Sequence, residues 1–183
     1  KTHRKPVILV CTSGSAVAHY MPAVLEAQYS GVPLIILSAD RPHTLQHVGA
    51  PQTVDQQKIF GTAVNYYEEL AVPQQEHYYT YPRLVARKAY MKSMDVKRGP
   101  VHINVPLFEP LVPELDRRHF ECGRQPFSVV PAAIQPGDVC TIYDLLANKK
   151  VLILAGPSTN LEDADAILGL SNIFHAPILG DPL

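Results

Sequence analysis

Two apolar strands around one helix, near the N-terminus, constrain the fold of this chain more than any other feature. Residues 6–11 form a continuous apolar run of strand length, which predicts a strand buried on both faces. A hydroxyl-rich turn follows at 12–15. Apolar residues then recur at helical spacing over roughly 16–29, where Pro22 kinks the helix or marks its real start. A second apolar run occupies 33–38, so the segment predicts a right-handed βαβ unit with parallel strands.

The alternation of helix and strand continues along the first hundred or so residues. The further elements that the pattern predicts are a short helix at 56–60, a strand at 62–67, an amphipathic helix at 81–94 and a strand at 101–105. Gly99 and Pro100 separate the last helix from the last strand. Repeated alternation of this kind predicts an α/β fold with a doubly wound parallel sheet.

The periodicity fades over 107–148, where prolines recur among charged residues. We expect this segment to be an ordered crossover with a helix within 136–148, anchored by four side chains, Phe108, Leu111, Phe120 and Phe127. A new unit then begins, with strand, helix and strand predicted at 151–155, from Leu161 and at 177–179. The predicted division is a first domain over 1–106, the crossover over 107–148, and the opening of a second α/β domain over 149–183, where the chain looks truncated.

Composition excludes several classes of protein. Sixteen basic and seventeen acidic residues give a formal net charge of −1 without any basic run, so neither nucleic acid nor an anionic membrane is an expected partner. No apolar stretch reaches the roughly 18 residues that a membrane-spanning helix needs. Cys11, Cys122 and Cys140 form no C-x-x-C pair, which argues against a disulfide scaffold or a zinc ribbon. We therefore expect a soluble, cytoplasmic protein.

Polar residues follow the predicted strands at the sheet edge where open parallel sheets bind their ligands. The turn Thr12-Ser13-Gly14-Ser15 brings hydroxyls and a glycine to a helix N-terminus, where it either binds an anion or simply caps the helix. Arg41 follows the second strand and offers a fork-shaped guanidinium for a carboxylate. Alternatively, Arg41 pairs with Asp40 or Asp55 within the chain.

Other candidates are interpreted as structural. Cys11 and His19 suggest a thiol–imidazole pair, but Cys11 lies inside an apolar strand. His43 and His47 could ligate a metal, yet no third ligand has a matching context, so we expect surface histidines. The tyrosine clusters have no basic groove beside them and are interpreted as packing and surface groups: Tyr66-Tyr67 and Tyr78-Tyr79-Tyr81.

Three segments together carry a resemblance to a known family. They are V-C-T-S-G-S-A-V-A with the following P-A-V-L-E-A (10–27), L-S-A-D-R-P leading to G-A-P-Q (37–52), and G-P-V-H-I-N-V-P with E-P-L (99–111). The chain resembles the thiamine-diphosphate-dependent enzymes, and T-S-G and G-P-V-H-I-N-x-P are shared loosely across that superfamily. A-D-R-P with its downstream glutamine, and E-P-L, resemble the MenD family of menaquinone biosynthesis more sharply. The resemblance covers most of 5–113 and, faintly, 149–183.

The resemblance implies an activity and a set of site residues. The implied reaction is decarboxylation of 2-oxoglutarate on thiamine diphosphate, with Mg²⁺, followed by addition of the succinyl semialdehyde unit to isochorismate. Arg41 and Gln52 match family positions that face the substrate and the cofactor intermediate. Four residues match the loop that lines the pyrimidine side of the cofactor: Thr12, Ser13, Gly14 and Ser15. Both substrates carry two carboxylates, so a fixed arginine and an amide are physically expected.

The resemblance also implies what this chain lacks. The family's activating glutamate lies before the first strand and is not matched by Glu26, Glu68 or Glu69, and the G-D-G…N segment that holds Mg²⁺ and diphosphate belongs to a later domain. We therefore expect no catalytic residue, no metal ligand and no activity in this chain alone, which is then the end of a pyrimidine-binding domain. The complete enzyme is expected to be a homodimer or a homotetramer.

Two alternatives remain open on the sequence. One is a different thiamine-diphosphate-dependent 2-oxoacid decarboxylase or carboligase, such as an acetohydroxyacid synthase, which would favour smaller, more apolar contacts where Arg41 and Gln52 stand. The other is a noncatalytic α/β module that binds a small anion at the turn 12–15.

Overall fold

The structure is a computed structural model that describes residues 5–72, 80–112, 136–156 and 161–180. The chain divides into two compact units, Lys1–Phe127 and Ser128–Leu183, and each is described by itself. Within the described residues, no helix is both long enough and apolar enough to cross a membrane.

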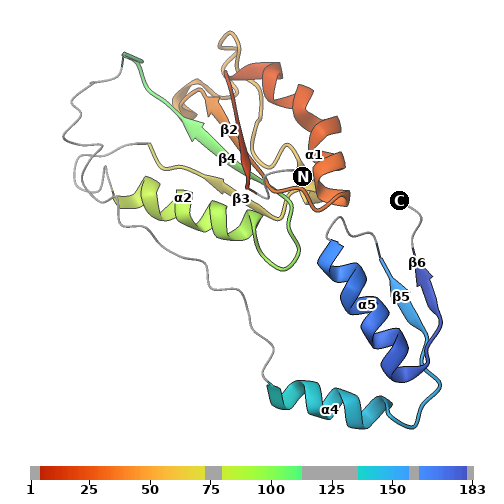
Figure 1. The fold of residues 1–183 in the computed structure, drawn as a ribbon. Coiled ribbons are helices and arrows are strands. Elements are labelled where there is room, and N and C mark those ends of the chain that lie inside the picture. The colour runs from red at the N-terminus through yellow and green to blue at the C-terminus, as the bar shows by residue number, and fades with distance from the viewer. Residues whose placement is uncertain (1–4, 73–79, 113–135, 157–160, 181–183) are drawn as a thin grey trace. The chain divides into compact units, whose positions relative to one another are not determined.

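The first unit is a four-stranded parallel sheet with a helix on each face (Figure 1). Its strands stand in the order β1-β2-β4-β3. The elements in chain order are β1 (Val7–Cys11), the 3₁₀ helix η1 (Gly14–Tyr20), α1 (Met21–Tyr29), β2 (Leu34–Asp40), the 3₁₀ helices η2 (His43–Leu45) and η3 (Gly61–Ala63), β3 (Tyr66–Glu69), α2 (Thr80–Ser93) and β4 (Pro100–Pro106). The predicted doubly wound parallel sheet is confirmed.

Strand β2 joins the two cores because its successive side chains point to opposite faces. Leu34 and Ile36 pack under η1 and α1 with Val17 and Val24, whereas Ile35 packs under α2 in a separate cluster. β2 therefore lies buried along nearly its whole length. This burial explains why its sequence is continuously apolar rather than alternating.

The edge strand β1 departs from the prediction. Its residues were expected to be buried on both faces, but Val7 is 57% exposed and Val10 is 68% exposed. Leu9 and Cys11 do pack against the cluster under α1. Within the described residues β1 pairs with β2 alone, and α2 lies mainly over β2, β3 and β4. Continuous apolarity thus predicted the strand correctly and its burial wrongly.

Local backbone conformation decides one open alternative and accounts for one difference. Pro22 stands in the first turn of α1, so it marks the start of the α-helix after a 3₁₀ segment and does not kink it. The helix predicted at 56–60 is instead a series of turns, because Lys58 adopts a left-handed backbone with φ of 51°. The third strand also begins later than predicted, at Tyr66, because residues 61–63 form the 3₁₀ helix η3.

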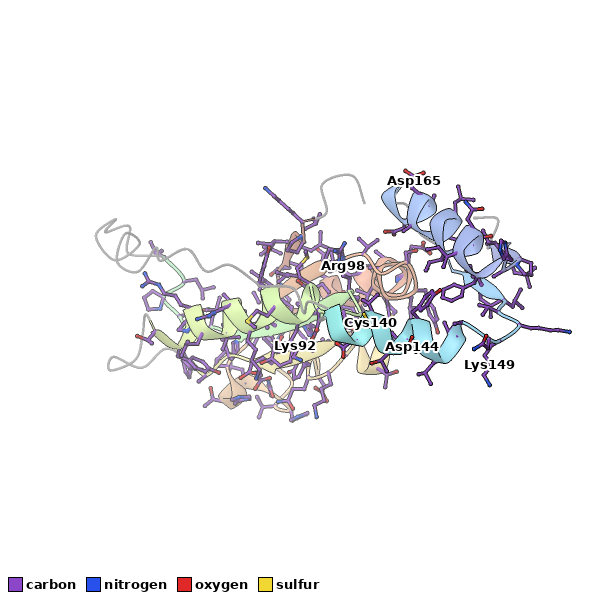
Figure 2. The ribbon with its side chains drawn as sticks, turned by 60° about the horizontal axis from the view of Figure 1, so that its bottom comes forward. Lys92, Arg98, Cys140, Asp144, Lys149 and Asp165 are labelled. Carbon is purple, nitrogen blue, oxygen red and sulfur yellow. The ribbon has the colours of Figure 1, made fainter. Side chains whose placement is uncertain are left out.

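The second unit contains α4 (Pro136–Leu146), β5 (Ile153–Ala155), α5 (Leu161–Phe174) and β6 (Ile178–Gly180). β5 and β6 pair in parallel and are connected by α5, which confirms the predicted βαβ element. Cys140 and Asp144 lie on α4, and Asp165 lies on α5 (Figure 2).

The predicted anchoring of the crossover fails where it can be checked. Phe108 and Leu111 are more than half exposed, so they do not act as anchors within the described residues. Phe120 and Phe127, like the rest of 113–135, lie outside the described residues.

Candidate functional site

The carboxyl ends of the parallel strands bring distant polar residues to one edge of the sheet. Cys11 of β1 stands beside Ser38 of β2, and Ser38 stands beside Asn104 of β4. Asn104 in turn stands beside Glu69, the last residue of β3. The turn after β1 and Arg41 after β2 therefore share one edge, as expected for ligand sites of such sheets.

Gln52 closes over the turn that follows β1. Its Nε2 donates to Thr12 Oγ1 at 3.0 Å and to the carbonyl oxygen of Ser13 at 3.2 Å. Gly14 makes this approach possible, because a Cβ there would lie 3.1 Å from Cγ of Gln52 and 3.3 Å from its carbonyl oxygen. The φ of Gly14 is also +89°, which L side chains rarely adopt. The glycine is therefore required by both space and backbone conformation.

A cavity of about 560 Å³ opens between the turn and the segment that carries Gln52. Five of the six site residues predicted from the sequence line it, together with His19: Thr12, Ser13, Gly14, Ser15 and Gln52. Its lining offers hydroxyls, an amide and an imidazole beside the methyl groups of Ala16 and Val54. Such a wall suits a flat heterocycle with hydrogen-bonding edges.

Arg41, the sixth predicted residue, is not part of that lining. Its backbone N–H donates to Asp40 Oδ1 at 2.7 Å, and its guanidinium lies 3.7 Å from the carboxylate of Glu109. The Nε atom of Arg41 is buried without a partner among the described residues. Glu109 is 76% exposed, so this ion pair is weakly held. Neither alternative partner, Asp40 or Asp55, pairs with the guanidinium in the described part of the chain.

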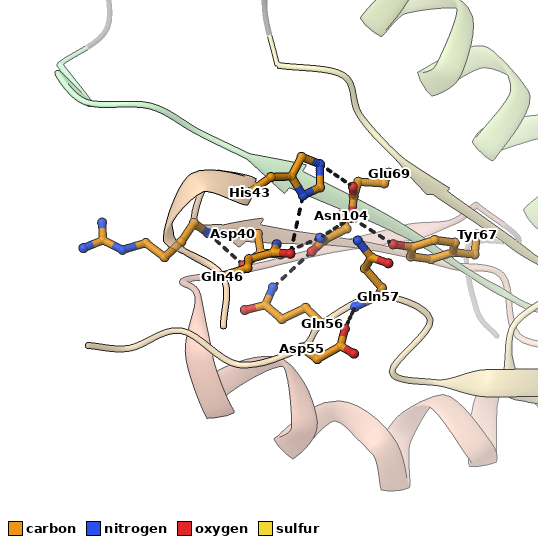
Figure 3. A network of polar contacts seen from close by, with 10 residues as sticks. Asp40, His43, Gln46, Asp55, Gln56, Gln57, Tyr67, Glu69 and Asn104 are labelled. Atoms are coloured by element: carbon orange, nitrogen blue, oxygen red, sulfur yellow. Dashed lines mark hydrogen bonds and ion pairs between the residues drawn. The ribbon is translucent and has the colours of Figure 1, made fainter. Parts of the chain in front are cut away.

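A buried amide network lies behind this edge (Figure 3). Asn104 Nδ2 donates to Asp40 Oδ2 at 2.7 Å and to Glu69 Oε2 at 3.2 Å. Because carboxylates only accept, Asn104 Oδ1 faces the other way and accepts from Ser38 Oγ at 2.8 Å and Gln56 Nε2 at 3.0 Å. All four hydrogen-bonding positions of the Asn104 side chain are therefore used.

This network fixes the tautomer of His102, and burial keeps its ring neutral. The single hydroxyl proton of Ser38 goes to Asn104 Oδ1, so His102 Nε2, 2.7 Å from Ser38 Oγ, must be the donor. Its Nδ1 is buried with no partner in the described residues, and the ring packs edge-on against Phe60 with centroids 4.9 Å apart. Burial lowers the pKa of His102 to about 4. Nothing in the sequence around His102 indicates that its ring is buried and hydrogen-bonded to Ser38.

The histidines considered as metal ligands have ordinary surroundings. His43 Nε2 lies 3.0 Å from Glu69 Oε1, and His43 Nδ1 lies 3.4 Å from Gln46 Oε1 (Figure 3). His47 is exposed. In the ranges that the structure describes, no group of three or more His, Cys, Asp or Glu side chains could hold a metal ion.

Cys11 and Tyr67 behave as structural groups, whereas the candidates Tyr78 and Tyr79 lie outside the described residues. Burial raises the pKa of Cys11, partly offset by a hydrogen bond with Tyr20, so the thiolate of a catalytic cysteine is disfavoured. Tyr67 packs against His102 with ring centroids 5.2 Å apart. Burial, with the carboxylate of Glu69 nearby, raises the pKa of Tyr67 as well.

The sequence of this chain is similar to known proteins of one family. Residues 1–59 match the family model described as the thiamine pyrophosphate enzyme, N-terminal TPP binding domain. Over its whole length the chain is 48% identical to the 2-succinyl-5-enolpyruvyl-6-hydroxy-3-cyclohexene-1-carboxylate synthase of Lactococcus lactis subsp. cremoris (strain SK11). It is 46% identical to the synthase of that name from Desulfitobacterium hafniense (strain DSM 10664 / DCB-2). The chain spans 33% of the length of each of these relatives.

A solved structure supports the fold independently. The benzoylformate decarboxylase of Polynucleobacter necessarius superposes with a TM-score of 0.69 over 98% of this chain and 32% of that one, at 23% identity. At this identity the likeness concerns the fold alone. The family follows from the sequence matches instead: the chain belongs to the thiamine pyrophosphate enzyme family, within the group of 2-succinyl-5-enolpyruvyl-6-hydroxy-3-cyclohexene-1-carboxylate synthases.

Proposed function

We propose that this chain is part of a synthase that decarboxylates 2-oxoglutarate on thiamine diphosphate and adds the succinyl semialdehyde unit to isochorismate. One observation carries the proposal: in a chain 48% identical to such a synthase, the turn after β1 and Gln52 close on each other around one cavity. Arg41 stands at the same edge of the sheet, and among the described residues its guanidinium pairs only with an exposed carboxylate.

The residues around the cavity fit the pyrimidine side of the cofactor. The close packing of Gln52 on Gly14 leaves backbone and hydroxyl groups of the turn as the wall, without a side chain in between. Thr12, Ser13 and Ser15 would hold and orient the ring through these groups, and Gln52 would face the reacting carbon skeleton. When bound, thiamine diphosphate supplies the electron sink for decarboxylation.

Arg41 is proposed to bind a carboxylate of the substrate. Its planar fork can make two parallel hydrogen bonds to one carboxylate, which the single 3.7 Å contact with Glu109 does not use. Carboxylate binding of this kind orients the dicarboxylate before reaction and contributes to KM.

Further parts of the proposal rest on the family and on the sequence pattern. Mg²⁺ and the diphosphate would be held outside this chain, in a complete enzyme that is a homodimer or homotetramer acting in the cytoplasm. The domain limits remain those predicted, at 1–106, 107–148 and 149–183. The chain alone would be inactive, because the activating glutamate would be supplied by residues before it. The two cysteines among the described residues, Cys11 and Cys140, are free, which is compatible with a reducing compartment.

The test uses the complete synthase that carries this chain. Arg41→Ala should raise KM for a dicarboxylate substrate by a factor worth about 2–3 kcal/mol, roughly 30- to 150-fold, since it removes a charged hydrogen-bonding partner. Arg98→Ala is the matched control, because Arg98 is exposed and precedes β4, whereas Arg41 follows the carboxyl end of β2. Unchanged kcat/KM in Arg41→Ala would discard the role of Arg41.

Decarboxylation of pyruvate instead of 2-oxoglutarate by the wild-type enzyme would favour the acetohydroxyacid synthase-like alternative. Binding of a small anion by an enzyme without any decarboxylase activity would favour the noncatalytic module.

A further inference from the structure

Gln56 lies on a turn outside the sheet, yet its side chain is completely buried. Its Oε1 accepts the backbone N–H of Gly14 at 2.8 Å. Its Nε2 donates to the carbonyl oxygen of Ala39 at 3.1 Å and to Asn104 Oδ1 at 3.0 Å. One carboxamide thus ties together the turn after β1, the end of β2 and the end of β4.

The link continues from Asn104 to the substrate side of the proposed site. Asn104 Nδ2 donates to Asp40 Oδ2, and Asp40 Oδ1 accepts the backbone N–H of Arg41 (Figure 3). Asp40 is 3% exposed, so water competes little for these bonds. A continuous hydrogen-bonded path therefore runs from Gly14 to Arg41 through three buried side chains, Gln56, Asn104 and Asp40.

The orientation of both amides is dictated by their neighbours. The carboxylates of Asp40 and Glu69 require the NH₂ group of Asn104, which leaves its oxygen for Gln56. Gln56 must then present NH₂ to Asn104 and its oxygen to the N–H of Gly14. Neither an apolar side chain nor an ionised carboxylate can supply both a donor and an acceptor at this position.

We propose that Gln56 is a positioning residue, which fixes the cofactor-side turn at Gly14 relative to Arg41. This inference rests on the proposed function for its catalytic consequence, but the link itself can be measured without any substrate. A shift of about 1 Å between two halves of a site can cost on the order of 100-fold in rate. A purely structural role in the core would instead lower stability and leave the site geometry intact.

The link itself is tested by hydrogen exchange in the complete synthase. The Gly14 amide should exchange slowly in the wild type, because its acceptor is buried, and at least tenfold faster in Gln56→Met, which retains length but cannot accept. Gln57→Met is the matched control, since the neighbouring Gln57 side chain is exposed. The Gln57 backbone N–H, which donates to the exposed Asp55 carboxylate, should exchange fast throughout. A rapidly exchanging Gly14 amide in the wild type would overturn the proposal, whatever the variants do.

The catalytic consequence is tested with the same proteins. Gln56→Met should lower kcat by about 10- to 100-fold with a smaller change in KM, whereas Gln57→Met should leave both within twofold. If Gln56→Met does not fold, Gln56→Glu is used, which can accept from Gly14 but, when ionised, cannot donate to Asn104 or Ala39. Gln56→Glu should then retain a slowly exchanging Gly14 amide but show the same loss of kcat.

The outcomes separate this inference from the proposed function. Faster exchange at Gly14 in Gln56→Met with unchanged kcat would overturn the positioning role while leaving the function intact. A wild-type enzyme that does not decarboxylate 2-oxoglutarate would refute the proposed function, and the exchange result at Gly14 would still stand on its own.

Discussion

His102 should make the stability of the first unit depend on pH. Its ring is fully buried, and its Nε2–H donates to Ser38. Its Nδ1, which could accept a hydrogen bond, has no donor partner among the described residues. Protonation would place a charge on Nδ1 in an apolar environment beside Phe60. The native state therefore resists protonation, and burial lowers the pKa of His102 to about 4.

The size and direction of the effect follow from the two pKa values. The unfolded chain has the ordinary histidine pKa of 6.5, above the folded value of about 4. Above pH 6.5 both states are neutral and the full contribution is present. As the pH falls from 6.5 to 4, only the unfolded state takes up the proton, so the free energy of unfolding decreases by about 1.4 kcal/mol per pH unit, about 3 kcal/mol in all. Below pH 4 both states are protonated and the contribution changes no further.

The assay is urea unfolding at a series of pH values, for the wild type and for His102→Gln. Glutamine keeps an N–H donor toward Ser38 but does not titrate in this range, so the difference between the two curves isolates His102 from the other seven histidines. As the pH is lowered from 6.5 to 4, the free energy of unfolding of the wild type should fall toward that of His102→Gln. Parallel curves across this range would refute the reasoning, as would an imidazole that titrates near pH 6.5 by NMR in the folded protein.

Two further predictions concern the packing of the first unit. Gly14→Ala should reduce the free energy of unfolding more than Gly49→Ala does. Both glycines have positive φ, so alanine at either position should lower the free energy of unfolding by about 1–2 kcal/mol. A new Cβ would also crowd Gln52 at Gly14, whereas at Gly49 no atom lies within 4 Å. If urea unfolding showed equal decreases in the free energy of unfolding for the two variants, the Gln52 side chain would have moved aside without a measurable cost. Ile36→Ala, at a fully buried position of β2, should cost about 3–4 kcal/mol, whereas Val10→Ala on the exposed edge strand β1 should cost less than about 1 kcal/mol. A comparable loss at both positions in the same assay would contradict the assignment of β1 as an exposed edge.

Sequence reasoning succeeded where structure follows from local pattern. The apolar runs at β1, β2 and β4 and the helical spacing at α1 and α2 predicted these elements and their parallel arrangement, because periodicity and connection length are properties of the chain itself. The resemblance of the motifs to thiamine-diphosphate-dependent enzymes was confirmed by whole-length similarity. The roles assigned to Arg41 and Gln52 stay predictions.

Sequence reasoning failed where a residue's surroundings come from distant segments. Gln56 was placed in a short helix, and nothing nearby in the sequence indicates that its amide reaches Gly14, Ala39 and Asn104. Likewise, the nearby sequence offers Asp40 and Asp55 as partners of Arg41, whereas the observed partner, Glu109, follows the carboxyl end of β4.

The order of elements, the two apolar faces of β2 and the place of a ligand edge at the ends of parallel strands were thus determined by the sequence alone. Only the tertiary structure decided that β1 stands at an exposed edge, that His102 is buried and neutral, and that a buried amide joins the two halves of the proposed site. Burial and hydrogen-bond partners depend on which strands become neighbours, and an apolar run looks the same in sequence whether it has one neighbouring strand or two.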